Sequence, residues 1–451
     1  MTDHRILEAY GLFSAKVPRY TSYPPANHFT PETGGAHQKP WLEAIPEGAD
    51  LSIYVHIPFC RRLCWFCACR TQGTSTLRPV DQYVETLLDE LAAVRTALPA
   101  SPRMVRLHLG GGTPTLLSVE TMRRLIGAFD ATFDKAPGFE FSAEIDPTEA
   151  ADELLDALIA LGMTRASIGV QDFDPLVQAA IGREQSLEET AAVIARLRAG
   201  GVTSLNLDLL YGLPHQSAGS LATTLQEVLC LEPDRLALYG YAHVPWMSKR
   251  QVLIKDDTLP SARERFGLAE MAREVLTADG YEALGIDHFV RPQDSLAVAA
   301  RNGTMRRNFQ GYTDDPADYL IGLGASAISR FPQGYVQNAV ATSAYKNRVG
   351  IGRLAGDKGI VLTDEARATG AMIEAILCQG RIDVAAISAA FPRMQDRIAR
   401  TVEDLNRWAA DVTAMSGEVL VLDPDYMALA RILAGRLDGL VRSEGAHSAA
   451  V

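Results

Sequence analysis

Three cysteines in one short segment constrain this chain more than any other feature. Cys60, Cys64 and Cys67 form a C-x3-C-x2-C run within YVHIPFCRRLCWFCAC. Thiolates are the ligands that iron–sulfur clusters prefer. Three thiolates can bind three irons of a four-iron cluster and leave the fourth iron open to a ligand that is not protein, much as a catalytic zinc keeps one position open. A structural zinc knuckle, with Cys69 as the fourth ligand, is the alternative interpretation of this run.

A unit of one strand and one helix recurs along the chain about every 30–40 residues, which is the spacing of βα units. Between strands, apolar residues recur with a period near 3.6, as in the helix expected from about Pro79. Polar residues and glycines gather where the strands end, and parallel barrels place their sites at that end. The sequence therefore predicts an α/β fold with a partial (βα)6 barrel, more open than one of eight strands. The six predicted strands are Leu51–Val55, Val105–Leu109, Glu140–Ile145, Arg165–Val170, Ser204–Leu210 and Arg235–Tyr241.

The chain divides into three predicted parts. These are an N-terminal arm at 1–48 that covers the barrel mouth, the barrel with an extension at 49–330, and a small, mostly α-helical domain at 331–451. Ser261 and Glu264 form a capping box that begins a helix within the extension. Beyond about Arg330 the pattern becomes mainly helical, and we expect the tail at 443–451 to be disordered. The elements predicted in this last part are a helix over Thr363–Cys378, a strand over Glu418–Leu422 and a helix from Pro424.

Charge and hydropathy exclude several classes of protein. The formal net charge of −12 argues against nucleic-acid binding, which needs a basic surface. No apolar stretch reaches the roughly 18 residues that cross a bilayer, and the N-terminus lacks the pattern of a signal peptide. We therefore expect a cytoplasmic protein with no membrane contact.

The cysteines outside the run have a simpler interpretation. Six cysteines in 451 residues are too few and too clustered for a disulfide framework. A reducing compartment would also keep the thiolates of the run free to bind a cluster. Cys230 and Cys378 stand alone in apolar surroundings, so we expect each to be a small buried hydrophobic residue.

Two further features lie next to the cysteine run in the predicted barrel. Tyr54 and His56 alternate on the strand that enters the run, so both point to one face of the sheet, the barrel interior. The three glycines of Gly110–Gly112 follow the second strand, where a backbone without Cβ atoms can approach a ligand closely. Neither a Walker A nor a G-x-G-x-x-G motif occurs, so nucleotide phosphate binding is not indicated.

Eight segments spread along the chain resemble a single family. The cysteine run alone resembles the radical S-adenosylmethionine (SAM) superfamily. The first and last segments select, within it, the oxygen-independent coproporphyrinogen III oxidases (coproporphyrinogen dehydrogenases) of bacterial haem synthesis. The resemblance extends from about Tyr10 to about Asn338 and is weaker beyond. The segments are PRYTSYPPA (Pro18–Ala26), YVHIPFC (Tyr54–Cys60), CAC (Cys67–Cys69), GGGTP (Gly110–Pro114), GVQDF (Gly169–Phe173), DLLYGLP (Asp208–Pro214), IDHF (Ile286–Phe289) and RNFQGYT (Arg307–Thr313).

The resemblance implies a [4Fe–4S] cluster held by Cys60, Cys64 and Cys67, with Cys69 near the cluster but not a ligand. It also implies two SAM molecules, and catalytic roles for Tyr54 and His56. The residues implied for the first SAM, which binds the open iron, are Tyr54, Phe66, Gly111, Glu144 and Ile328. The second SAM is assigned Gly112, Thr113, Gln171, Arg183, Asp208 and Ala242.

The substrate implied by the resemblance is coproporphyrinogen III, two propionates of which are converted to vinyl groups to give protoporphyrinogen IX. A reducing protein such as flavodoxin or ferredoxin supplies electrons, the final acceptor is unknown, and the enzyme is expected to be a monomer. Arg19, Arg307 and Gln310 are the candidate substrate residues, the two arginines for carboxylates. If the two outer segments meet at the barrel mouth, they also bring Tyr20, Tyr23, Asn308, Phe309 and Tyr312 over the substrate; a solvated surface is the alternative.

Three other functions remain open alongside the oxidase. They are a haem-binding chaperone on the same scaffold, an anaerobic haem-degrading methyltransferase and a zinc-binding structural protein. The chaperones typically lack the cysteine at position 69 and the long N-terminal arm, both of which are present here. Trp65, between the second and third cysteines, and Trp246–Met247 depart from the usual pattern of the oxidases.

Overall fold

A 12-stranded sheet organises the computed structural model, which describes residues 3–440. Six neighbouring strands of this sheet are parallel and correspond to the six predicted ones. Five of them extend one or more residues beyond the predicted bounds, whereas the last ends one residue early. The predicted α/β fold with a (βα)6 barrel is confirmed. The six strands are β1 (Asp50–Ile57), β4 (Arg103–Gly111), β5 (Asp134–Ile145), β6 (Arg165–Gln171), β7 (Ser204–Tyr211) and β8 (Arg235–Gly240).

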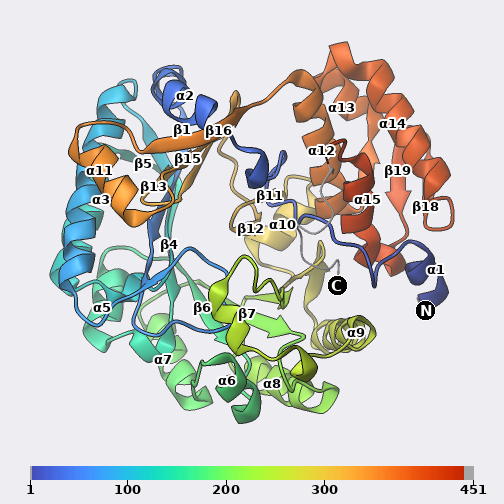
Figure 1. The fold of residues 1–451 in the computed structure, drawn as a ribbon, viewed down its shortest axis with the longest axis horizontal. Coiled ribbons are helices and arrows are strands. Elements are labelled where there is room, and N and C mark those ends of the chain that lie inside the picture. The colour runs from blue at the N-terminus through green and yellow to red at the C-terminus, as the bar shows by residue number, and fades with distance from the viewer. Residues whose placement is uncertain (1–2, 441–451) are drawn as a thin grey trace.

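Helices cover the outside of the barrel (Figure 1). In α3, the residues Val80, Val84, Leu87 and Leu91 are all buried, because their helical spacing places them on the face toward the sheet. Side-chain caps at Ser118 and other polar residues fix where several of these helices begin. The covering helices are α3 (Arg78–Ala97), α4 (Val119–Thr132), α5 (Asp152–Ala160), α6 (Pro175–Ile181), α7 (Leu187–Ala199) and α8 (Ala218–Cys230).

The sheet continues past both ends of the barrel. β13 (Tyr319–Leu323) lies parallel to β1, and three antiparallel strands follow it; β10 (His288–Val290) and β9 (Glu282–Leu284) extend the other edge. The expectation of mainly helical structure after Arg330 is therefore wrong as far as Val361. Glycines within these strands weaken the apolar alternation by which strands are recognised. The three strands are β14 (Ile328–Phe331), β15 (Gly334–Asn338) and β16 (Gly356–Val361).

A helical unit with its own apolar core begins at Asp364. The helix predicted over Thr363–Cys378 is present, with Thr363 as its cap, whereas the one predicted from Pro424 starts as a 3-10 turn over Pro424–Leu429. A small antiparallel sheet completes the unit. Its elements are α12 (Asp364–Gln379), α13 (Val384–Ala390), α14 (Gln395–Trp408), α15 (Ala430–Leu437), β17 (Arg381–Asp383), β18 (Thr413–Ser416) and β19 (Val419–Leu422). The tail predicted to be disordered lies outside the described residues.

The first forty residues join these two parts. Leu7 and Leu12 are buried in the core of the helical unit, around α1 (His4–Ala9), while α2 (Pro31–Glu43) packs on β15 and β16. Figure 1 shows the intervening segment crossing between barrel and helical unit. The predicted capping box is present at the start of α9 (Ala262–Ala278). The remaining elements are α10 (Ser295–Arg301), α11 (Thr342–Gly350), β2 (Phe59–Cys60), β3 (Gln72–Gly73), β11 (Arg306–Asn308), β12 (Gly311–Thr313) and 3-10 turns at Ala26–His28, Pro114–Leu116, Pro147–Glu149, Lys249–Leu253, Asp256–Thr258 and Pro392–Met394.

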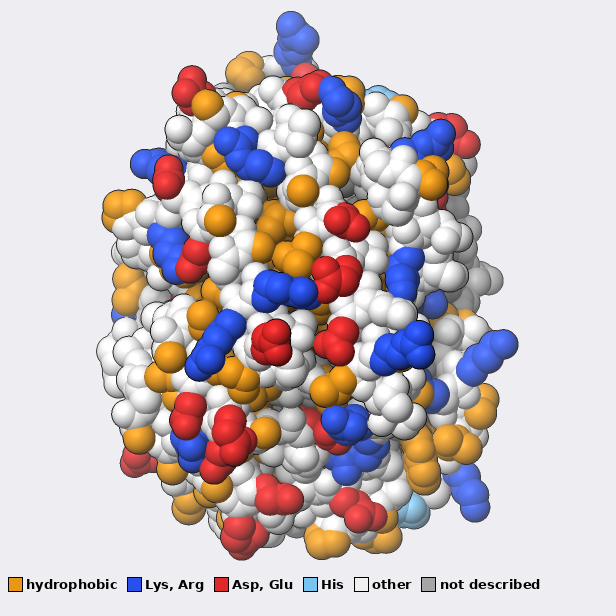
Figure 2. All heavy atoms as spheres, turned by 90° about the vertical axis from the view of Figure 1, so that its left-hand side faces the viewer, with side chains coloured by type: hydrophobic (Ala, Val, Ile, Leu, Met, Phe, Trp, Pro, Cys, Tyr) orange, Lys and Arg blue, Asp and Glu red, His pale blue; other side chains and the backbone are white. Residues whose placement is uncertain are grey.

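The surface carries side chains of both charges, and the prediction of burial is wrong for one of the two isolated cysteines. Lysines and arginines are interspersed with acidic residues on the face in Figure 2. Within residues 3–440, no helix combines the length and apolarity needed to span a bilayer. Cys378 is buried as predicted, whereas Cys230 is exposed. Cys230 ends α8 two residues after the buried Val228, so the helical turn places it on the opposite side.

Candidate active site

The cysteine loop follows β1 at the carboxyl end of the barrel. Cys60 ends β2, Cys64 is buried, and none of these cysteines forms a disulfide. Burial raises the pKa of Cys60 to about 11, against a hydrogen bond from Thr113 that lowers it. The pKa of Cys67 is held at about 6, chiefly by a hydrogen bond from Cys69. Cys69 thus lies beside the run, as predicted.

The donor set of this loop fits a cluster better than a single ion. Within residues 3–440, no three His, Cys, Asp or Glu side chains converge closely enough to hold one metal ion. A structural zinc needs four ligands around one ion, whereas each ligand of a four-iron cluster binds a different iron. Three thiols on one loop, close enough to influence one another's pKa, suit the second arrangement.

Tyr54 and His56 form a hydrogen-bonded pair on β1, on one face as predicted. His56 Nε2 lies 3.1 Å from the carbonyl oxygen of Arg70, which can only accept, so Nε2 carries the proton. Burial lowers the pKa of His56, and Nδ1 of the neutral ring accepts from the Tyr54 hydroxyl at 3.0 Å. Tyr54 also stacks on His108. The pair fixes the end of the cysteine loop at Arg70.

The glycine turn after β4 lies directly against this pair. A Cβ atom at Gly111, whose φ is +112°, would lie 2.5 Å from His56 Nδ1, and one at Gly112 would lie 2.5 Å from the carbonyl oxygen of Phe59. Only glycine leaves room for this approach. The Thr113 amide donates to the same Phe59 carbonyl at 2.7 Å, so the turn is fastened to the strand that carries Cys60.

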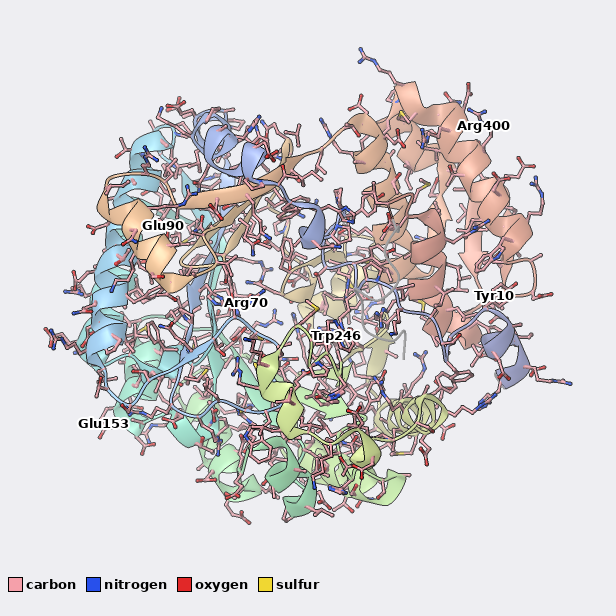
Figure 3. All side chains as sticks on the ribbon, viewed as in Figure 1. Tyr10, Arg70, Glu90, Glu153, Trp246 and Arg400 are labelled. Carbon is pink, nitrogen blue, oxygen red and sulfur yellow. The ribbon has the colours of Figure 1, made fainter. Side chains whose placement is uncertain are left out.

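A cavity of about 580 Å³ occupies the inside of the barrel next to this loop. Its volume falls in the range of sites for small molecules and cofactors. Ten of the residues singled out from the sequence line it: Tyr54, His56, Cys69, Gly111, Glu144, Asp208, Phe309, Gln310, Tyr312 and Ile328. Other lining residues had no predicted role, among them Arg70, His108, Ser142, Tyr239 and His288. Figure 3 labels Arg70 near the middle of the molecule.

Two carboxylates of the cavity have pKa values that are shifted in opposite directions. Burial raises the pKa of Glu144, but His108 and the Gly111 amide outweigh burial, so the net pKa is lowered. The Gly111 amide donates to Glu144 Oε2 at 2.9 Å. Burial raises the pKa of Asp208 to about 6, although Ser167 and Asn206 donate to its two oxygens. The pair thus offers one firmly ionised carboxylate and one that titrates near neutrality.

Six of the residues assigned to SAM lie outside this cavity: Gly112 and Thr113 of the glycine turn, and Phe66, Gln171, Arg183 and Ala242. Arg183 is buried; its Nη1 pairs with Asp146 at 2.9 Å and lies 3.7 Å from Cys64 Sγ. Gln171 ends β6 with a φ of +70°, which is uncommon outside glycine. Phe66 packs in a small apolar cluster below the loop, and Ala242 lines a second pocket.

The candidate substrate residues separate into two places. Arg19 and Arg307 meet, because Arg307 Nη2 donates to the Arg19 carbonyl at 3.4 Å, and both line the second pocket. Arg307 is buried, which overturns the solvated alternative for it. Tyr20 and Tyr23 do not reach the main cavity: their hydroxyls donate to Asp438 at 3.0 and 3.2 Å.

The loop that contains the unusual Trp246 and Met247 supports the cysteine run from outside. Both side chains are exposed, and Trp246 is labelled in Figure 3. Farther along this loop, Ser248 Oγ donates to the Cys67 carbonyl at 2.9 Å, and Gln251 Nε2 donates to the Phe66 carbonyl at 2.7 Å. The departure at Trp246–Met247 therefore lies at the surface, outside the cavity. Trp65, the other departure, is partly buried and packs against an apolar cluster that contains Val177 and Ile181.

Comparisons with known proteins agree with this geometry. The family model described as "Radical SAM superfamily" matches residues 54–228. The chain is 50% identical to an oxygen-independent coproporphyrinogen III oxidase of Paracoccus denitrificans, with all of both chains covered. It is 41% identical to the Escherichia coli protein of the same name, over 82% of this chain and 80% of that one. A solved coproporphyrinogen III oxidase from E. coli superposes with a TM-score of 0.91 at 35% identity, covering 97% of this chain and 99% of that one.

A parallel barrel with a three-cysteine loop at the carboxyl end of its first strand defines a radical SAM enzyme. The class uses a [4Fe–4S] cluster and SAM. Within the class, identity over the full length and the near-complete structural match decide the family. The chain belongs to the oxygen-independent coproporphyrinogen III oxidases, as its eight segments predicted.

Proposed function

We propose that this chain converts coproporphyrinogen III to protoporphyrinogen IX without oxygen, in haem synthesis. The observation that carries the proposal is the 50% identity, over the whole chain, to a relative named for this activity. The main cavity supports it, since it places polar groups suited to a cofactor, among them Glu144 and Asp208, beside the cysteine loop. None of the described contacts favours a chaperone or a methyltransferase.

The chemistry removes one hydrogen atom, one electron and carbon dioxide from each of two propionates, which leaves two vinyl groups. When bound, the cluster and SAM supply the 5′-deoxyadenosyl radical that takes the hydrogen atom from the β-carbon. Cys60, Cys64 and Cys67 hold the cluster through three thiolates. A reducing protein such as flavodoxin or ferredoxin delivers electrons, and a one-electron acceptor takes up the electron released.

The residues for SAM fall into the two sets given above. Tyr54, Gly111, Glu144 and Ile328 share one cavity, which supports a single ligand among them. The ionised Glu144 suits ribose hydroxyls as an acceptor. Asp208 lines the same cavity and supports a second ligand close to the first.

Tyr54 and His56 have their proposed role at the wall of this cavity. Their hydrogen bonds run from Tyr54 through the neutral imidazole to the Arg70 carbonyl. These two hydrogen bonds hold the end of the cysteine loop in place and fix the orientation of both side chains at the cavity wall.

The arrangement of the chain supports the remaining proposals. We assign the arm at 1–48 to covering the barrel mouth and the region 49–330 to the cofactor barrel. Of the region 331–451, we assign the helical unit that begins at Asp364 to closing the substrate side. The contact between Arg19 and Arg307 supports this closure. We propose a cytoplasmic monomer that acts on coproporphyrinogen III, with neither nucleic acid nor membrane as a partner.

An anaerobic assay tests the proposed function. Reconstituted protein is incubated with coproporphyrinogen III, SAM, a reductant and cell extract, and the tetrapyrroles are separated by chromatography. We expect protoporphyrin from the wild type and none from Cys64→Ser. SAM cleavage without protoporphyrin would contradict the decarboxylation, and tight haem binding by that sample would indicate the chaperone instead.

A further inference from the structure

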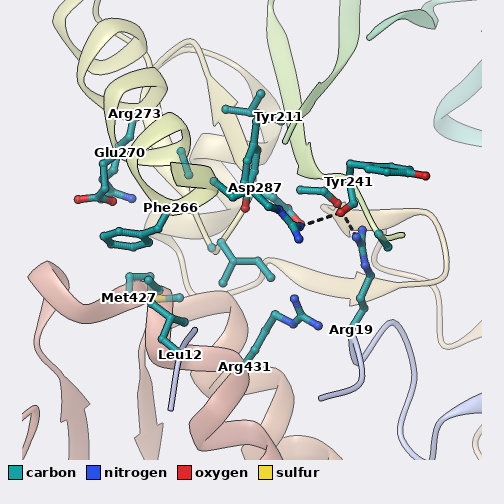
Figure 4. Close-up of a pocket in the computed structure, with 18 of the residues that line it drawn as sticks. Leu12, Arg19, Tyr211, Tyr241, Phe266, Glu270, Arg273, Asp287, Met427 and Arg431 are labelled. Carbon is teal, nitrogen blue, oxygen red and sulfur yellow. Dashed lines mark hydrogen bonds between the residues drawn. The ribbon is translucent and has the colours of Figure 1, made fainter. Parts of the chain in front are cut away.

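A pocket of about 110 Å³ lies between the barrel, the arm and the helical unit (Figure 4). Its composition is unusual for a protein with a net charge of −12. Among its described lining residues are five arginines and only two carboxylates, Glu270 and Asp287. The arginines come from segments far apart in the sequence: Arg19, Arg265, Arg273, Arg307 and Arg431.

Two of these arginines have unused hydrogen-bonding capacity. The side chain of Arg307 is 4% exposed and lies 3.9 Å from Asp287, yet its Nε and Nη1 have no hydrogen-bond partner among the described residues. Arg265 donates through Nη2 to the Tyr241 carbonyl at 2.7 Å, while its buried Nε has no partner there either. Buried donors are nearly always satisfied, so these three N–H groups are available to an acceptor that enters the pocket.

The arginines also repel one another. Burial lowers the pKa of Arg431 to about 9, and the charges of Arg19 and Arg307 add to the effect. Burial likewise lowers the pKa of Arg265, with a further contribution from Arg19. Figure 4 shows Arg19 and Arg431 extending toward the same space, which Asp287 borders. An anion entering this space would relieve the repulsion and satisfy the unused donors.

The pocket adjoins the main cavity through a shared wall. Asp287 lines the pocket, and its neighbour His288, which lines the cavity, contacts it through Nδ1 at 2.6 Å. Arg307 lies over the ring of Tyr312, another cavity residue, at 4.5 Å. A volume of about 110 Å³ is too small for a porphyrinogen ring but large enough for a carboxylate group.

We propose that this arginine pocket binds the carboxylate of a propionate that the reaction retains. Arg265 and Arg431 then join Arg19 and Arg307 as residues that select the substrate. The inference rests on the proposed function, because that function supplies a ligand with four carboxylates, two of which remain in the product. A retained carboxylate anchors the ring while the other propionates are converted. The carboxylate of SAM fits less well, since its ammonium group would face the same arginines.

Helix α9 offers matched variants for a test. Arg265 and Ala269 lie one turn apart and both line the pocket, whereas Arg263 is exposed on the same helix. Arg265→Met keeps the apolar stem and removes the charge, Arg265→Lys restores the charge, and Arg263→Met is the control. Ala269→Glu places a carboxylate inside the pocket, with Ala269→Gln as its uncharged control.

Two quantities are measured on each reconstituted protein: the thermal midpoint without ligand, and the dissociation constants of coproporphyrin III and of SAM. We expect Arg265→Met to weaken coproporphyrin III binding about ten- to a hundredfold, with partial rescue by Lys and unchanged SAM binding. The thermal midpoint should change little, because relief of burial and of repulsion from Arg19 offsets the lost bond to the Tyr241 carbonyl. Ala269→Glu should weaken coproporphyrin III binding and raise the midpoint by about 1–2 °C relative to Ala269→Gln.

The outcomes separate this inference from the proposed function. Unchanged coproporphyrin III affinity in Arg265→Met and Ala269→Glu would overturn the pocket even if the wild type makes protoporphyrin. A lowered thermal midpoint with unchanged coproporphyrin III affinity would assign the arginines a structural role and overturn the proposal as well. A loss of affinity for SAM alone would also overturn it. Weaker coproporphyrin III binding by Arg265→Met and Ala269→Glu, together with a wild type that makes no protoporphyrin, would support the pocket and refute the proposed function.

Discussion

The hydroxyl of Tyr54 satisfies a buried acceptor on His56, and its removal would leave that acceptor without a partner. We therefore expect Tyr54→Phe to lower the free energy of unfolding by about 1–3 kcal/mol. Urea denaturation of the metal-free protein measures the loss. Tyr319→Phe is the control, because the Tyr319 hydroxyl has no hydrogen-bond partner among residues 3–440. Equal stability of the two variants would show that the bond contributes nothing.

Asp208 gives the cavity a pH dependence. Its folded pKa of about 6 lies above the ordinary value of 3.8, so the folded state is penalised above pH 6, and the penalty disappears as the pH falls toward 4. We expect Asp208→Asn to be more stable than the wild type at pH 7.5, by up to roughly 3 kcal/mol, with the difference narrowing at pH 5. Denaturation at these two pH values measures it. A stability advantage of Asp208→Asn that grows toward pH 5 would contradict the raised pKa of Asp208.

Residues that act close to the cysteine run could be predicted from the sequence, whereas those brought together by distant segments could not. Tyr54, His56 and Gly111 lie on strands whose pairing follows from the βα order, and they line one cavity. Arg265 and Arg431 lie on helices where an arginine is ordinarily solvated, and only the packing of the helical unit on the barrel buries them. No local pattern distinguishes such a residue.

At the scale of single elements, the glycine turn after β4 is the most demanding. Gly111 has a left-handed φ and no space for a Cβ atom beside His56, so Gly111→Ala is expected to lower stability by about 1–3 kcal/mol. Gly127 in α4 has nothing within 4 Å of its Cβ position, so Gly127→Ala should raise stability by about 0.5–1 kcal/mol. Calorimetry of both variants tests whether the two changes in stability have opposite signs. A shift of the same sign in both would contradict this account of the turn.

The elements that the sequence predicted share a physical origin. The six barrel strands carry buried apolar residues on the side that the helices cover, as in the alternating pattern of β6, and the helices have one apolar face. β13 was missed although it pairs in parallel with β1, because the two strands are far apart in sequence. β15 and β16 alternate in burial but are short and rich in glycine, so their pattern resembles that of a loop.

Across the whole molecule, the arm links the barrel to the helical unit. Asp438, just beyond α15, accepts hydrogen bonds from both Tyr20 and Tyr23, and it is itself buried. Arg19 immediately precedes Tyr20 and reaches the Gly240 carbonyl at 2.6 Å, at the end of β8. The position of Arg19 in the arginine pocket therefore depends on a contact with the opposite end of the chain.

Asp438→Ala removes both tyrosine contacts at once, and we expect the arm to loosen while the barrel stays folded. Hydrogen exchange of the backbone amides at 17–25 should become about tenfold faster or more, since two charge-assisted hydrogen bonds of about 1.5 kcal/mol or more each are lost. Amides of β6 and β7 should not change. Asp411→Ala is the matched control, because Asp411 accepts from Tyr10 at the exposed surface of the same unit. Uniformly faster exchange in the barrel strands would mean that Asp438 stabilises the whole fold, and unchanged exchange at 17–25 would mean that apolar packing alone holds the arm.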